Sequence, residues 1–142
     1  MLTFAMALTI PASELDECMR LARPGYEAIS LTNDLYSWRK ERVDAEKAGQ
    51  DYVFNAIWVV MKERGCSELM AINICEQEIR RRIAQFDANV KGARHAGFSR
   101  DTVAYLEAVK LSHVGNLVWS IYCPRYHGMY VVLILWAVRM RS

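Results

Sequence analysis

The most informative part of this sequence is Asn33-Asp34-Leu35-Tyr36-Ser37-Trp38-Arg39-Lys40-Glu41. Within it, Asn33, Ser37 and Glu41 follow one another at intervals of four residues. Four residues advance an α-helix by about 400°, which returns within about 40° of the starting direction. The three oxygen-bearing side chains are therefore expected along one stripe of a helix, two turns long.

This stripe, made of Asn33, Ser37 and Glu41, combines an amide, a hydroxyl and a carboxylate oxygen. Such hard ligands, with water and phosphate oxygens, suit Mg²⁺, which favours octahedral oxygen coordination and often shares its site with a substrate phosphate. Lys40 directly precedes Glu41 and could offer a positive charge to that phosphate. The spacing therefore indicates a candidate Mg²⁺ site.

Ordinary solvated helix faces also carry Asn, Ser and Glu at this spacing. The segment just before the stripe, residues 28–32, is mostly apolar, which indicates a buried helix instead. A carboxylate on a buried helix needs a partner, and a cation would be one. The spacing alone leaves both interpretations open.

The stretch 33–41 resembles the second metal-binding motif of class I terpene synthases, (N/D)D(L/I/V)x(S/T)xxxE, at every specified position. Lysine before the final glutamate is similar to the fungal enzymes, especially cyclase domains of the fusicoccadiene and ophiobolin synthase type. A second stretch, from Trp119 to Tyr126, resembles the WxxxxxRY element of the same family. The resemblance covers the chain from about Thr9 to Tyr126.

The resemblance implies an all-α fold, a partial class I terpenoid synthase bundle of five or six helices. It also implies a Mg²⁺-dependent lyase that ionises a prenyl diphosphate (farnesyl, geranylgeranyl or geranylfarnesyl) and cyclises the resulting carbocation. The implied Mg²⁺ ligands are Asn33, Ser37 and Glu41, the implied diphosphate-binding groups are Lys40, Arg125 and Tyr126, and the implied cation-stabilising wall residue is Trp119.

The first metal motif of that family, an aspartate-rich cluster such as DDxxD, has no counterpart in these 142 residues. The nearest acidic group, residues 14–17, has the pattern of a helix N-terminus instead. We therefore expect residues 1–127 to form the C-terminal part of a terpene cyclase domain whose N-terminal half is missing. The chain alone is expected to be inactive.

Two other hypotheses remain. The chain could be a non-catalytic helical module that binds an isoprenoid, a protein partner or a second copy of itself through an exposed apolar face. It could also be an unrelated helical bundle with chance motif matches. Trp119 could simply fill a core, and Gly115 could mark either a close helix contact or room for a substrate.

Composition narrows the function classes. The net charge of +2 gives no reason to expect nucleic acid binding. The four cysteines form no CxxC pair, which is typical of reduced thiols in a cytoplasmic protein. No run of ~18 to 20 apolar residues is present, so a membrane span is not expected.

Turn and capping residues predict where the helices begin and end. Pro24 predicts a break or kink between two helices, and glycines 49, 65 and 97 and Pro124 predict helix ends. Leu69 and Leu111 are expected to face inward. The predicted N-caps are Ser13, Asp51, Ser67 and Ser99.

The last fifteen residues, 128–142, do not continue the resemblance. They contain an unbroken apolar run from Val131 to Val138, too short for a bilayer and too uniform for an exposed amphipathic helix. A terminal strand or a buried helix is one interpretation. Because Gly128-Met129-Tyr130 can be encoded with the sequence GTATGT, a common fungal 5′ splice site, we hypothesise that this tail is translated intron.

Overall fold

The computed structural model describes residues 6–126, and these residues form an all-α fold, as the sequence predicts. The described helices are α2 (Ala12–Lys47), α3 (Ala56–Arg64), α4 (Glu68–His95) and α5 (Arg100–Tyr122), followed by helical residues 124–126. The tail 128–142 and its interpretation lie outside the described residues. Among the described helices, none is long and apolar enough to cross a membrane.

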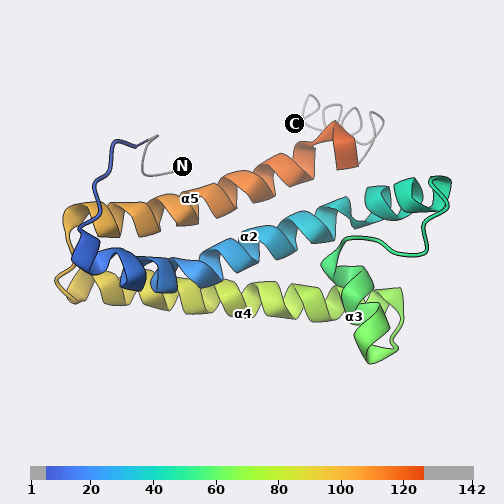
Figure 1. The fold of residues 1–142 in the computed structure, drawn as a ribbon, viewed down its shortest axis with the longest axis horizontal. Helices are drawn as coiled ribbons and strands as arrows, with labels where there is room; N and C mark the ends of the chain where they lie inside the picture. The colour runs from blue at the N-terminus through green and yellow to red at the C-terminus, as the bar shows by residue number, and fades with distance from the viewer. Residues whose placement is uncertain (1–5, 127–142) are drawn as a thin grey trace, which may run out of the picture.

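Three long helices lie side by side, and the short α3 packs against α2 and α4 at one end of the bundle (Figure 1). α2 and α5 run in the same direction, and α4 runs back between them in sequence. α2 contacts all three other helices, because both α4 and α5 pack along its length and α3 packs near its C-terminal half. The stripe predicted from sequence therefore lies on the central helix.

Two apolar clusters hold the helices together. The first lies between α2, α4 and α5 and includes Cys18, Leu21, Ala22, Phe86, Val90, Ala93, Tyr105, Leu106 and Val109. The second joins α2 to α3 and α4 through Trp38, Ile57, Ala71 and Cys75. All four cysteines are free, in agreement with the sequence prediction.

Gly25 lies where α2 packs tightly against both α4 and α5. A Cβ atom built on it would lie 2.9 Å from Val109 on α5 and 3.0 Å from Phe86 on α4. Gly115, in contrast, has no atom of the described residues within 4 Å of such a Cβ. No close helix contact therefore explains Gly115 in this part of the chain.

The predicted division into two helices at Pro24 is wrong, because α2 continues through this residue. Proline removes one intrahelical hydrogen bond. The turns on either side are nevertheless held by burial of Leu21, Ala22 and Ala28 against the neighbouring helices. Tertiary packing therefore overrides the local cost.

Two of the four predicted N-caps are wrong. Pro11, and not Ser13, precedes the first turn of α2, and Asn55, and not Asp51, caps α3. The caps at Ser67 and Ser99 are confirmed: each side chain accepts a backbone N–H at 3.3 Å. Gly65 ends α3 with a left-handed φ of 57°, a conformation that glycine adopts without steric cost.

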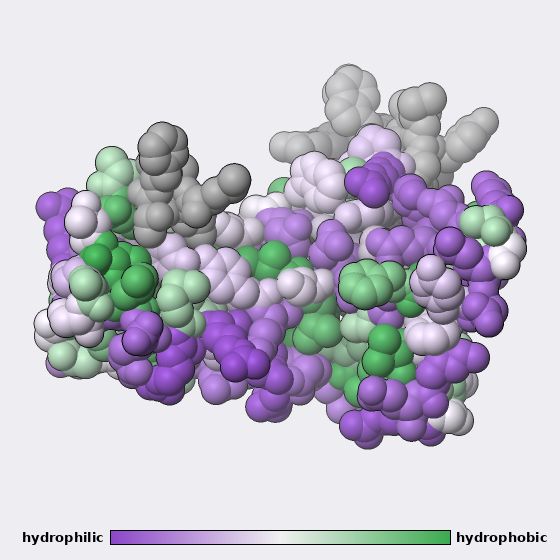
Figure 2. Space-filling view, viewed as in Figure 1, coloured by the Kyte–Doolittle hydropathy of each residue, from purple (hydrophilic) through white to green (hydrophobic). Residues whose placement is uncertain are grey.

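The expectation that Leu69 and Leu111 face inward is also wrong. Their side chains are 70% and 71% exposed, respectively. Figure 2 shows that apolar residues gather over α3 and near the start of α2, while hydrophilic residues follow α4 along one edge of this face. Apolar residues are thus not confined to the core.

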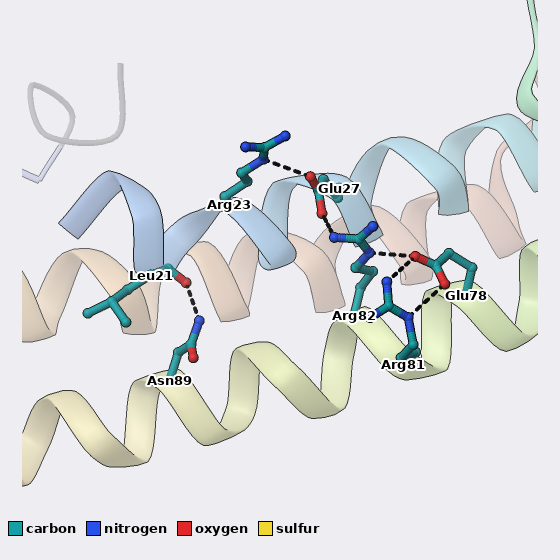
Figure 3. Close-up of polar contacts among 7 residues, drawn as sticks. All are labelled: Leu21, Arg23, Glu27, Glu78, Arg81, Arg82 and Asn89. Atoms are coloured by element: carbon teal, nitrogen blue, oxygen red, sulfur yellow. Dashed lines mark hydrogen bonds and ion pairs between the residues drawn. The ribbon is translucent and has the colours of Figure 1, made fainter. Parts of the chain in front are cut away.

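A polar network joins α2 to α4 beside the first cluster (Figure 3). Glu27 on α2 pairs with both Arg23 and Arg82, and Arg82 also donates to Glu78 at 2.6 Å. Further along, the Asn89 side chain donates to the Leu21 carbonyl oxygen at 2.9 Å. These contacts fix the alignment of the two helices.

Candidate metal and diphosphate site

Two residues of the stripe, Ser37 and Glu41, face the start of α3, and the third, Asn33, faces Tyr126. Ser37 is 2% exposed, and Asn33 and Glu41 are half-buried. Their spacing on a continuous α-helix places all three on one side of α2. The part of α2 that carries the stripe is at least half-buried at these three positions, as the apolar residues 28–32 predict.

Asn55, the N-cap of α3, brings Ser37 and Glu41 together. Its side-chain nitrogen lies 3.0 Å from Glu41 Oε2 and 3.5 Å from Ser37 Oγ. The same nitrogen donates to the backbone oxygen of Asp34 at 2.8 Å. A single buried amide therefore contacts two stripe residues and the backbone between them.

Asp34 fixes α3 against the stripe by a separate contact. Its Oδ2 accepts a hydrogen bond from the backbone N–H of Ala56 at 2.9 Å, in the first turn of α3. Burial raises the pKa of the Asp34 carboxyl, the Ala56 hydrogen bond opposes this shift, and the nearby Glu41 charge adds to it. The carboxylate favours the positive N-terminal end of the α3 dipole.

The second sequence motif meets the stripe at Asn33. The Tyr126 hydroxyl donates to Asn33 Oδ1 at 2.8 Å, and burial raises the pKa of this hydroxyl. The Trp119 ring packs edge-on against the Tyr126 ring, with centroids 5.5 Å apart. Trp119 is half-exposed, at 51%, so it does not serve as core filling among the described residues.

Basic side chains surround a pocket of about 340 Å³ beside Tyr126. Its charged lining residues are Arg39, Lys40, Asp44, Lys47 and Arg125. Lys40 forms an ion pair with Asp44, which holds the pKa of that carboxyl below its usual range. Four cations against one carboxylate make this pocket suited to an anion.

A larger pocket, of about 730 Å³, lies further toward the start of α2. Met19, Tyr26 and Ser30 line it, and they precede Asn33 at helical spacings, so they share its side of α2. The Tyr26 hydroxyl is held by that of Tyr105 at 2.6 Å. The other lining residues include Arg23, Glu27, Glu78 and Arg82, which pair with one another. This pocket and the candidate metal stripe are therefore neighbours along one side of α2.

The donor set fits Mg²⁺ chemically. All three side chains offer oxygen, and no hydrogen bond from a described residue reaches Glu41 Oε1. The Asn33 carbonyl oxygen keeps a second lone pair beyond its bond to Tyr126. The described residues hold no cluster of three or more His, Cys, Asp or Glu placed for a metal. They therefore contain no second candidate metal site built from thiolate, imidazole or several carboxylate ligands.

Sequence reasoning missed Asn55, Arg39 and Lys47 as parts of the site. Asn55 carries the signature of an N-cap before an apolar helix, but Asp51 four residues earlier carries it equally well. Arg39 and Lys47 lie on the quoted helix but outside the motif. Only the position of Tyr126 beside α2 shows that they share a pocket with Arg125.

Comparison with known proteins agrees with these motifs. The family described as terpene synthase family 2, C-terminal metal binding, matches residues 1–85. The chain is 47% identical over 128 residues to the bifunctional type I diterpene synthase tndC of Aspergillus flavipes, which covers 89% of this chain and 17% of that protein. It is 45% identical over 127 residues to talaropentaene synthase of Talaromyces verruculosus, covering 89% and 19%.

Fusicoccadiene synthase of Phomopsis amygdali is 38% identical over 128 residues, covering 89% of this chain and 18% of that enzyme. The chain thus spans less than a fifth of the length of these relatives. The matches confirm the family resemblance, and the family model includes residues 33–41. This chain belongs to terpene synthase family 2 and matches its C-terminal metal-binding part.

Proposed function

We propose that this chain supplies one metal site and the diphosphate contacts of a Mg²⁺-dependent terpene cyclase. The substrate would be a prenyl diphosphate, either farnesyl, geranylgeranyl or geranylfarnesyl. The observation that carries the proposal is the hydrogen bond from Tyr126 to Asn33, which joins two motifs 93 positions apart. If the two sequence motifs matched the family only by chance, no contact between them would be expected.

Different residues of the site would bind the metal and the diphosphate. Asn33, Ser37 and Glu41 would hold Mg²⁺ through their oxygens, and when bound this ion would stabilise the negative charge that develops on the departing diphosphate. Lys40 and Arg125 would bind diphosphate oxygens from the basic pocket. Because Lys40 already pairs with Asp44, the diphosphate must compete with that carboxylate.

The larger pocket on the same side of α2 supports a role in holding the prenyl chain, because part of its lining is apolar and its charged residues pair with one another. Met19, Tyr26 and Leu31 offer apolar and aromatic surface in that pocket. An aromatic face attracts a cation within about 6 Å of its centre. Trp119 does not line this pocket among the described residues, but its exposed ring could meet the cation from the other side of Tyr126.

We also propose that these 142 residues alone do not complete a turnover, because they contain one metal motif of the two that the family uses. The test is incubation of the chain with each of the three prenyl diphosphates and Mg²⁺, followed by product analysis. No cyclic product is expected. A cyclic terpene in any of these reactions would refute the proposed inactivity.

A non-catalytic interaction module is the second candidate, and one observation favours it. α5 exposes an apolar face formed by Leu111, Val114, Val118 and Tyr122. Exposed apolar faces of this kind mark interaction sites. Sedimentation equilibrium would discriminate: a dimer that Val118→Glu dissociates would favour this function, and a monomer at all concentrations would contradict self-association.

A further inference from the structure

Asn55 makes two kinds of contact at once. Its side-chain oxygen accepts the backbone N–H of Ile57 at 2.9 Å, which caps α3. Its side-chain nitrogen points the other way, toward α2, where it reaches the Asp34 carbonyl oxygen, Glu41 Oε2 and Ser37 Oγ. The whole residue is 3% exposed.

Capping alone does not explain why this residue is asparagine. A cap requires only a side-chain oxygen, and Ser, Asp and Asn serve about equally well. Neither Ser nor an ionised Asp could also donate an N–H to α2, and Asp would place a second carboxylate beside Glu41. The amide nitrogen is therefore accounted for by its contacts with α2.

The contact with Glu41 leaves the carboxylate free to act as a ligand. Asn55 engages Oε2 at 3.0 Å, and no described residue donates to Oε1. An amide has two N–H groups, and the two shorter contacts, to Asp34 and Glu41, can use both. Ser37, at 3.5 Å, is then packed beside the amide but keeps its oxygen lone pairs available.

We propose that Asn55 is a positioning residue for the metal stripe: its side-chain amide holds the Glu41 carboxylate, and packs Ser37, in the arrangement that binds a divalent cation. This inference rests on the proposed function. Hydrogen-bonding partners of metal ligands typically change metal affinity by 10- to 100-fold when they are replaced. The effect on affinity should be separable from any effect on folding.

The separation is possible because α3 has a second attachment to α2. Asp34 Oδ2 accepts the Ala56 N–H at 2.9 Å without using the Asn55 side chain. Asn55→Ser keeps an oxygen for the cap but loses the amide donor. Asn55→Gly lacks the donor too, and glycine at an N-cap costs only a few tenths of a kcal/mol relative to the best residues.

The experiment titrates the full chain with Mn²⁺ in the presence of inorganic pyrophosphate and measures free Mn²⁺ by electron paramagnetic resonance. Melting temperatures are recorded in metal-free buffer. Asn55→Ser and Asn55→Gly should bind Mn²⁺ about tenfold more weakly than the unaltered chain, a change of the size seen for partners of metal ligands. The control Ser67→Ala removes the cap of α4 and should lower the melting temperature without weakening Mn²⁺ binding.

Three outcomes decide the matter. Weaker Mn²⁺ binding in both Asn55 variants, with the control unchanged, supports the inference. Unchanged Mn²⁺ affinity in the Asn55 variants, while Glu41→Gln abolishes binding, overturns it and leaves the proposed function standing. Absence of Mn²⁺ binding by the unaltered chain, even with pyrophosphate, overturns the proposed function and the inference with it.

Discussion

The Tyr126 hydroxyl donates a hydrogen bond to the side-chain oxygen of Asn33, at 2.8 Å, across a separation of 93 positions. This bond places the end of the α5 segment directly against the stripe on α2. It also orients the Asn33 amide so that its oxygen, and not its nitrogen, faces the hydroxyl. The two motifs therefore form one site and not two.

Removing this bond should weaken metal binding more than it weakens the fold. Tyr126→Phe keeps the ring that packs on Trp119 but loses the hydroxyl that holds Asn33. We expect a stability loss of about 1 kcal/mol, the usual net value of one hydrogen bond, and several-fold weaker Mn²⁺ binding with pyrophosphate. Tyr122→Phe, at an exposed ring, is the matched control and should change neither.

The basic pocket predicts a charge-dependent affinity for pyrophosphate. Lys40→Gln or Arg125→Gln should each weaken binding by about tenfold, since a hydrogen bond to a charged group contributes roughly 1.5–3 kcal/mol. Both side chains line the pocket. Calorimetry at two salt concentrations measures the effect. Lys91→Gln alters an exposed lysine of α4 and should leave the affinity as it is; an equal loss in this variant would argue for non-specific attraction.

Two glycines on the long helices should respond in opposite directions to alanine. Gly25→Ala would place a Cβ 2.9 Å from Val109, so we expect a loss of about 1–3 kcal/mol from overpacking. Gly115→Ala meets nothing within 4 Å among the described residues and should stabilise the helix by up to about 1 kcal/mol. Urea unfolding of the two variants checks both signs, and a stabilising Gly25→Ala would contradict the packing described here.

Much of the fold could be predicted from local signals, and the errors have a common cause. Gly65 and the Ser67 and Ser99 caps act within one turn, so the sequence identifies them. Pro24 also acts locally, but burial on both sides of it depends on helices far away in sequence. Local preferences are weak beside such packing.

The candidate site also contains residues that local sequence identifies and a residue that only the fold reveals. Asn33, Ser37 and Glu41 could be identified because they lie within one short motif, whose helical spacing places them on one side of α2 and whose sequence resembles the family's. Asn55 could not, because its part in the site depends on the loop after α2 returning to Ser37 and Glu41. The roles of all these residues in metal binding stay predictions until metal binding is measured.

The Glu78 carboxylate predicts acid sensitivity of α4, because its partners Arg81 and Arg82 lie on the same helix. Its hydrogen bond from Arg81 is the main cause that lowers its pKa from 4.5 to about 2, and Arg82 adds to the shift. A carboxylate with a lowered pKa in the folded state stabilises the fold above its unfolded pKa. This stabilisation is lost as the pH falls from about 4.5 toward 2.

Glu78→Gln should therefore lower the melting temperature at pH 6. The melting temperature of this variant should also fall less between pH 5 and pH 3, the range in which a carboxylate with a lowered pKa loses its stabilising effect. Glu76→Gln, in the looser 3.7 Å pair with Arg80, is the control and should retain the decline of the unaltered chain. The same slope in Glu78→Gln as in the unaltered chain would show that Glu78 is not a source of the acid sensitivity.

The central claim is that the stripe on α2 binds a divalent metal together with a diphosphate, and calorimetric titration of inorganic pyrophosphate with and without Mg²⁺ tests it most directly. Binding should require Mg²⁺ and should weaken by at least about tenfold in Glu41→Gln, the scale expected for loss of a charged contact. Glu46→Gln, on the exposed side of the same helix, should bind as the unaltered chain does. Pyrophosphate binding that is independent of Mg²⁺, or that is unchanged in Glu41→Gln, would contradict the account.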